Sequence, residues 1–176
     1  ISQTILKSPN KVRRMIRIAK YDKLIEDYEK HCRRIAQATS ILINESLVIK
    51  NKRIKALEAE YVRWFEYYFP NYAKVKCAWF HKKLADKIIS NKKIRCLAEI
   101  YRSGGKSVHI DMGVPLYLML VKKDLKFMLQ VGETDTKAKI LISAIQAQLQ
   151  YNKRIINDYG VKFQYGDWSK GEFIPK

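Results

Sequence analysis

The residues best able to do chemistry form one short loop, Arg102-Ser103-Gly104-Gly105-Lys106-Ser107. Two glycines let backbone N–H groups approach an anion closely, and a lysine and a serine follow directly. In a phosphate-binding loop, Lys106 would reach the β- and γ-phosphates and the Ser107 hydroxyl would hold Mg²⁺. The usual pattern, G-x-x-x-x-G-K-[ST], has its first glycine where this chain has Ile100. A surface turn without a ligand is therefore the alternative.

The segments around this loop are those that a nucleotide-binding unit would use to position it. Residues 94–100 are a strand-like run, and a helix is predicted from Lys106 to about Val121. Residues 127–131 read as a buried strand, and Thr134 can cap a further helix that ends near Gly160. The order strand, loop, helix, strand, helix implies βαβ units, so we predict an α/β fold with a P-loop NTPase-type parallel sheet and flanking helices.

The first part of the chain predicts a basic helical arm or hairpin over residues 1–70. A helix follows Pro9, a second runs from about Ile41 to Tyr68, and Phe69-Pro70-Asn71 ends it. The first helix has apolar residues at helical spacing, among them Val12, Ile16, Ala19, Leu24, Tyr28, Cys32 and Ile35. Residues 71–176 are then an incomplete ATPase domain, which starts with a short helix at Trp79. The arm could bind DNA, or it could be a packed appendage with solvated charges.

The charge of the chain favours a polyanionic partner. The net charge is +18, from 35 Lys and Arg against 17 Asp and Glu. Residues 1–93 hold 22 of these basic residues and 9 of the acidic ones, so the first half is the favoured nucleic-acid surface. The alternative is a basic protein without such a partner.

The cysteine pattern indicates neither a disulfide framework nor a zinc site. The three cysteines are odd in number and form no CxxC pair, which fits a reducing, cytoplasmic setting. His31 and His81 are expected to lack acidic or cysteine partners at metal-ligand spacing, and His109 is expected to be structural. The longest apolar stretch, residues 114–121, is too short to cross a bilayer, so no membrane partner is expected.

The loop resembles the deviant Walker A loop of the large terminase subunits of tailed bacteriophages. In that family an arginine replaces the early glycine and precedes the lysine by four positions, as Arg102 precedes Lys106. Phe80-His81 resembles the aromatic–histidine pair upstream of that loop. Residues 114–118 resemble the proline-interrupted helix after it, and residues 131–135 resemble the next strand-to-helix passage. The resemblance covers about residues 62–165.

This resemblance implies an ATP-driven motor that packages viral DNA and that usually carries an endonuclease domain as well. It implies that Ser103, Gly104, Gly105, Lys106 and Ser107 bind the nucleotide, with Mg²⁺ on Ser107. Arg102 would stabilise the γ-phosphate beside Lys106, and Phe80 and His81 would flank the adenine. The implied partners are double-stranded viral DNA, the small terminase subunit, the portal protein and further copies of the chain, in the cytoplasm of the infected bacterium.

Two expected parts of such a motor are missing. No apolar strand ending in Asp, the Walker B element, follows Val131, and residues 163–167 are too polar to supply it. The nuclease carboxylates are absent too, so we expect an N-terminal fragment of a longer protein, which alone could be inactive. Two alternatives stay open: another nucleic-acid-dependent P-loop ATPase such as a helicase-like translocase, or a basic helical DNA-binding or assembly module without a nucleotide site.

Overall fold

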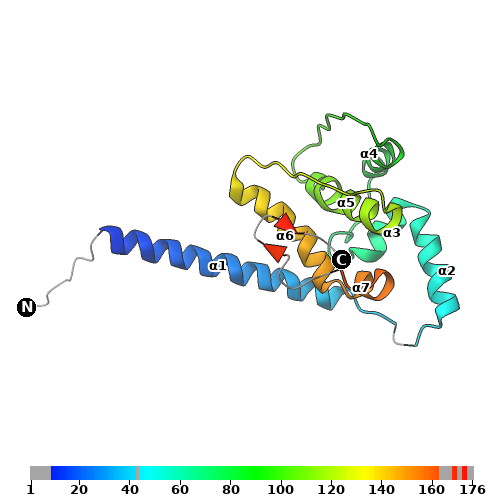
Figure 1. Ribbon diagram of the computed structural model, residues 1–176, viewed down its shortest axis with the longest axis horizontal. Helices are drawn as coiled ribbons and strands as arrows, with labels where there is room; N and C mark the ends of the chain where they lie inside the picture. The colour runs from blue at the N-terminus through cyan, green and yellow to red at the C-terminus, as the bar shows by residue number, and fades with distance from the viewer. Residues whose placement is uncertain (1–8, 43, 163–167, 170–171, 174–176) are drawn as a thin grey trace, which may run out of the picture.

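The computed structural model describes residues 9–42, 44–162, 168–169 and 172–173, and helices dominate this part of the chain (Figure 1). The side chains of residues 22–42 and 44–162 are described. The helices are α1 (Pro9–Ala38), α2 (Leu47–Glu58), α3 (Tyr61–Tyr68), α4 (Trp79–Ser90), η1 (Val108–Gly113), α5 (Val114–Tyr117), η2 (Leu118–Lys122), α6 (Asp135–Tyr151) and α7 (Lys153–Tyr159). The segments η1 and η2 are π-helical.

The predicted parallel sheet was wrong. Residues 94–100 and 127–131 form no strand, and the sheet found in the described part of the chain is a two-stranded antiparallel pair. Its strands, β1 (Trp168–Ser169) and β2 (Glu172–Phe173), have two residues each. Apolar runs predict buried strands only when neighbouring strands supply hydrogen-bond partners and cover both faces. Here the runs are extended connections whose side chains reach solvent, as Leu97 and Phe127 do with 87% and 80% exposure.

The core is built around the aromatic face of α3. Tyr61, Trp64, Phe65 and Tyr68 recur at helical spacing and are all buried. Tyr117 of α5 meets two of these rings edge to face, with centroids 5.6 Å from Tyr61 and 5.1 Å from Trp64. Such aromatic pairs contribute roughly 0.5–1.5 kcal/mol each beyond the area they bury. The α3 face therefore fixes where the segment after the loop must lie.

Gly113 allows this segment to approach α3 closely. A Cβ atom at Gly113 would lie 2.5 Å from the Tyr61 hydroxyl oxygen and 2.8 Å from Cδ2 of Phe65. Both distances are shorter than any relaxed contact, and both rings are held in the core. A side chain at position 113 would therefore push η1 away from α3.

Several helix predictions are confirmed, and two are corrected. The single helix predicted from Thr134 to near Gly160 is two helices, α6 and α7, because Asn152 is extended and its side chain caps α7. The helices after Pro9 and Trp79 are α1 and α4, although the side chains of Val12, Ile16 and Ala19 lie outside the description. Thr134 caps α6 by accepting a hydrogen bond from the N–H of Lys137, and Gly160 ends α7 with φ +79°. The predicted helix 41–68 is instead two helices, α2 and α3, separated at residues 59–60, and the Ser46 hydroxyl caps α2.

The helix after the loop is confirmed as a continuous helical run from residue 106 to residue 122. Pro115 lies inside it and has no N–H to donate to the carbonyl of Asp111. The side-chain amide of Gln130 donates to that carbonyl instead, at 2.6 Å. Lys123, with φ +54°, then ends the run in the left-handed conformation typical of a helix terminus. The extended segment 127–131 is thus tied to the middle of this helical run.

Helix α1 extends away from the body, and its C-terminal part lies along α6 (Figure 1). Cys32 and Ile35 of α1 pack with Ala147 of α6 in a small second cluster. The Thr39 hydroxyl donates to the carbonyl of Ile35 and accepts from the N–H of Lys153, which links the end of α1 to the start of α7. The C-terminal third of α1 is therefore part of the folded body.

Candidate functional site

The loop that the sequence singled out is a tight turn that opens directly into a helix. The N–H of Gly104 donates to the carbonyl of Tyr101 at 3.1 Å, and Ser103 and Gly105 both have positive φ, +66° and +72°. The N–H of His109 donates to the carbonyl of Gly105 at 3.1 Å, which places Lys106 in the first helical turn. The first N–H groups of a helix have no intrahelical partner, so they are free for an anion at this end.

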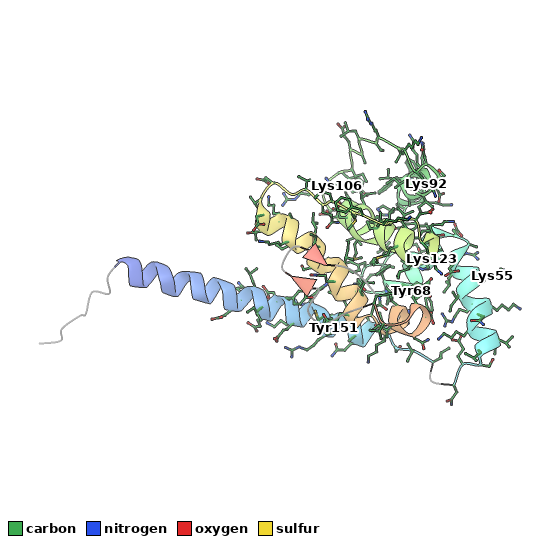
Figure 2. All side chains as sticks on the ribbon, viewed as in Figure 1. Lys55, Tyr68, Lys92, Lys106, Lys123 and Tyr151 are labelled. Carbon is green, nitrogen blue, oxygen red and sulfur yellow. The ribbon has the colours of Figure 1, made fainter. Side chains whose placement is uncertain are left out.

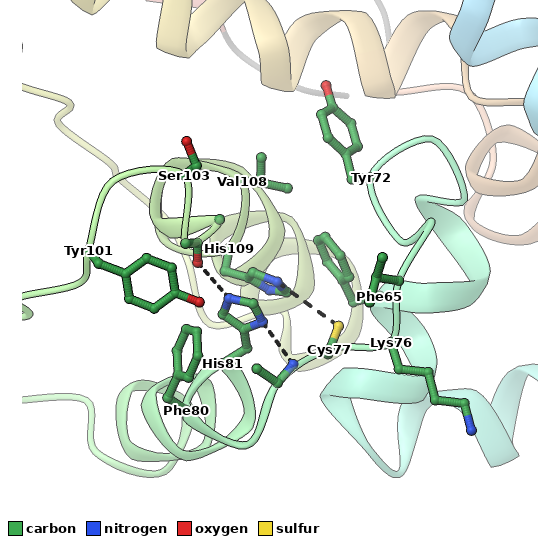
Figure 3. A pocket seen from close by; sticks show the side chains of 14 residues that line it. Phe65, Tyr72, Lys76, Cys77, Phe80, His81, Tyr101, Ser103, Val108 and His109 are labelled. Atoms are coloured by element: carbon green, nitrogen blue, oxygen red, sulfur yellow. Dashed lines mark hydrogen bonds between the residues drawn. The ribbon is translucent and has the colours of Figure 1, made fainter.

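A pocket of about 340 Å³ lies beside the loop and unites several of the predicted site residues (Figure 3). Ser103, Gly104 and Gly105 line one side, and Phe80 and His81 of α4 line another. The volume is within the range of roughly 300–1,000 Å³ that small-molecule sites have. Arg102, Lys106 and Ser107 are exposed and do not line the pocket. In the chain, these three residues flank Ser103, Gly104 and Gly105, which do line the pocket.

Helix α4 holds the loop through His81. The Nε2 of His81 donates to the carbonyl of Gly104 at 2.7 Å, and its Nδ1 accepts from the N–H of Ala78 at 3.1 Å. These two partners assign the proton to Nε2, because a carbonyl accepts and an amide N–H donates. Phe80 lies edge to face with Tyr101, with centroids 5.8 Å apart. The aromatic–histidine pair and the loop are thus in contact, although more than twenty residues separate them.

Two further residues, Cys77 and His109, complete the back of the pocket. The Sγ of Cys77 lies 4.0 Å from Nε2 of His109, and the His109 ring stacks on His81 with centroids 4.0 Å apart. The Nδ1 of His109 lies 3.0 Å from the hydroxyl oxygen of Tyr61. One ligand atom from each of Cys77, His81 and His109 lies within 4.8 Å of the others. These three side chains form a candidate metal-binding group.

The expectation that His81 has no cysteine partner was wrong. Cys77 precedes His81 by four residues, and that spacing was visible in the sequence. The spacing of residues in the sequence could not predict that His109 joins this group. His109 lies beside Cys77 and His81 only because η1 packs against α3. His109 has the structural contacts that were expected of it, with Phe65 and Tyr61.

Burial sets the protonation of this group. Burial, with a smaller effect of the adjacent His81, lowers the pKa of His109 to about 4, so its ring is neutral at pH 7. Burial, reinforced by the nearby Glu66 carboxylate, raises the pKa of the Cys77 thiol to about 12. At neutral pH the pair is therefore a thiol facing a neutral imidazole.

No helix among the described residues has both the length and the hydrophobicity that a membrane span requires. No protein-family model, curated protein or solved structure matches the chain.

Proposed function

We propose that the loop Arg102–Ser107 binds the phosphate groups of ATP with Mg²⁺, and that the protein is an ATPase component of a terminase-type viral DNA-packaging motor. The observation that carries this proposal is the pocket that joins the glycine loop to Phe80 and His81 at the N-terminus of a helix. These are the residues that the resemblance assigns to the phosphates and the adenine.

The charges around the loop suit a phosphate chain. Arg102 and Lys106 are exposed, and within the described part of the chain neither has a carboxylate partner. Both cations are therefore available to an anion, as are the unpaired N–H groups of the first helical turn. Ser107, in the same turn, presents the hydroxyl that would hold Mg²⁺.

The nucleotide base has a place in the same pocket. Phe80 and Tyr101 line it and present aromatic surface beside the loop. An adenine ring would pack against such surfaces while its phosphates extend towards Lys106. Among the residues described, the pocket lining contains no Asp or Glu, so we expect binding of ATP with slow hydrolysis by this chain alone.

The test is a titration with a fluorescent ATP analogue in the presence of Mg²⁺. Lys106→Ala should weaken binding by roughly 10- to 100-fold, because a hydrogen bond to a charged group contributes about 1.5–3 kcal/mol. The matched control is Lys92→Ala, which removes an exposed lysine that is paired with Asp124 on the surface. It should leave binding unchanged. Equal binding by the Lys106 variant, or no binding by the parent chain, would falsify the nucleotide site.

A second candidate is a basic helical nucleic-acid-binding module without a nucleotide site. The net charge of +18 on a helical fold favours it. The same titration separates the two functions, since this candidate predicts DNA binding with no affinity for the nucleotide.

A further inference from the structure

We propose that Cys77, His81 and His109 bind one divalent transition-metal ion of the zinc class, at the back of the pocket beside the loop. One thiolate and two imidazoles are ligands that Zn²⁺ prefers, and three protein ligands leave a fourth position for water. The site is separate from the proposed Mg²⁺ position at Ser107, whose hydroxyl oxygen is a ligand for a hard cation.

The distances are close to those that a tetrahedral site needs. With Zn–S near 2.3 Å and Zn–N near 2.05 Å, sulfur and nitrogen lie about 3.6 Å apart across a tetrahedral angle. Cys77 Sγ and His109 Nε2 are 4.0 Å apart, so they need to approach by only a few tenths of an ångström. All three ligand atoms lie within 4.8 Å of one another, so the ion requires side-chain adjustments of about 1 Å.

The second nitrogen of each histidine already has the partner that metal-bound histidines use. His109 Nδ1 lies on the Tyr61 hydroxyl, which leaves Nε2 directed at the Cys77 sulfur. His81 Nε2 donates to the carbonyl of Gly104, which leaves the lone pair on Nδ1. A carbonyl on the far nitrogen fixes both the tautomer and the ring orientation of a ligating histidine, and a hydroxyl there fixes the ring orientation.

Binding requires one exchange at His81. Its Nδ1 accepts the N–H of Ala78 at 3.1 Å, and the ring must turn from that N–H towards the ion. At Cys77 the Sγ–H bond breaks as the Sγ–metal bond forms, and the proton leaves to solvent. No electron is transferred. Because a proton is released, affinity must rise with pH.

Metal binding would also hold the loop. His81 would then join the ion to the carbonyl of Gly104 through one imidazole ring, and the ion would bridge α4 to η1 through His109. We therefore expect saturating Zn²⁺ to raise the thermal midpoint of the chain, since a ligand that binds only the folded state stabilises it.

The test uses the whole chain, stripped with EDTA, desalted and titrated with Co²⁺ and then Zn²⁺ in the absence of nucleotide. We expect one ion per chain by native mass spectrometry, with a thiolate-to-cobalt absorption band and the visible spectrum of tetrahedral cobalt. Cys77→Ser should abolish the thiolate band and the thermal shift. Cys96→Ser, which changes an exposed cysteine outside the group, is the matched control and should change neither.

A second variant tests the role of the histidine without removing a ligand. Tyr61→Phe keeps the buried ring but removes the hydroxyl that orients His109, so affinity for Zn²⁺ should fall by about 10-fold or more. Circular dichroism checks that each variant is folded. A missing cobalt band in the parent chain, or a band that survives in Cys77→Ser, would overturn the metal site. Neither result depends on whether the chain binds ATP.

Discussion

His31 of α1 is held partly buried under Tyr72, whose hydroxyl oxygen lies 3.2 Å from its Nε2. Burial, with a smaller effect of Arg34, lowers the pKa of His31 below its ordinary value of about 6.5. The unfolded chain therefore takes up a proton at His31 at a higher pH than the folded chain does. Between pH 7 and pH 5 this residue makes the folded state less stable as the pH falls.

We predict that His31→Gln reduces the pH dependence of stability in this window. Glutamine does not titrate, so the loss of unfolding free energy from pH 7 to pH 5 should be smaller than in the parent chain. One site contributes a slope of at most about 1.4 kcal/mol per pH unit. Urea unfolding at several pH values measures how the free energy of unfolding depends on pH in each protein. Identical slopes in the two proteins would contradict the lowered pKa.

The sequence predicted contacts between residues that are close in the chain, but it did not predict contacts that arise only when helices pack together. Gly105 followed by Lys106 predicted a turn opening into a helix, and φ at Gly105 and the helix both agree. The contact between His81 and the loop could be suspected only through the terminase resemblance. The approach of His109 to Cys77 had no signal in the sequence, because it depends on where α3 places η1.

Helices α2 and α7 are joined by one almost fully buried carboxylate. Arg53 of α2 donates to both carboxylate oxygens of Asp158, at 2.7 and 3.0 Å, and also to both oxygens of Glu45. The Asp158 side chain is 1% exposed and also accepts from the Tyr68 hydroxyl. Burial alone would raise the pKa of Asp158, but hydrogen bonds from Arg53 and Tyr68 outweigh it and leave the pKa below its usual value.

Arg53→Ala is therefore expected to destabilise the fold by about 3 kcal/mol at pH 7, because the buried Asp158 carboxylate keeps only the more distant Lys50 ammonium, 4.0 Å away, as a cationic partner. The stability from Asp158 is present above its unfolded pKa of about 3.9 and is lost as pH falls through the lower folded pKa. In the variant that pKa should rise, so the deficit against the parent should shrink as the pH is lowered towards 5. Denaturant unfolding at both pH values measures this.

The control for this prediction is an ion pair of the same type on the surface. Arg33→Ala breaks the pair with Glu29 on α1, where both side chains are more than half exposed. It should change stability by no more than about 0.5 kcal/mol. If the Arg53 variant is no less stable than the Arg33 variant, the ion pair between Arg53 and Asp158 does not stabilise the fold as predicted.

The elements also show why helices could be predicted here and strands could not. Caps such as Thr134 and Gly160 act within four residues, so the sequence contains the whole interaction. A strand exists only through a partner that can lie anywhere in the chain. Residues 94–100 have the composition of a strand but no partner among the described residues, and so the parallel sheet was predicted wrongly.

The positive charge of the whole molecule is distributed over many elements. Lys55, Lys92, Lys106 and Lys123 are all exposed and come from separate segments of the body (Figure 2). Helix α1 differs from the body because its first twelve residues contain five basic residues and no acidic one. It also extends away from the body (Figure 1). An extended basic helix can follow a nucleic-acid backbone without sequence-specific contacts, so α1 is the element where we expect phosphate contacts.

The last prediction concerns DNA binding by α1 and its dependence on salt. Each phosphate contact made by a basic residue contributes roughly 0.9 to the slope of log K against log salt. Replacing Arg13, Arg14 and Arg17 by alanine should therefore lower the slope by up to about 2.7 and weaken binding at low salt. Alanine favours a helix, so α1 should persist, and circular dichroism checks this.

The matched control lies on the same helix. Lys30 and Arg33 are already paired with Glu26 and Glu29, so replacing both by alanine should change the slope far less. Fluorescence anisotropy with a labelled duplex across a salt series measures all three proteins. If the control lowers the slope as much as the triple variant does, the change in slope reflects the net charge alone. The basic start of α1 then makes no special contribution to DNA binding. If the parent shows no salt dependence, the positive charge does not contact phosphate.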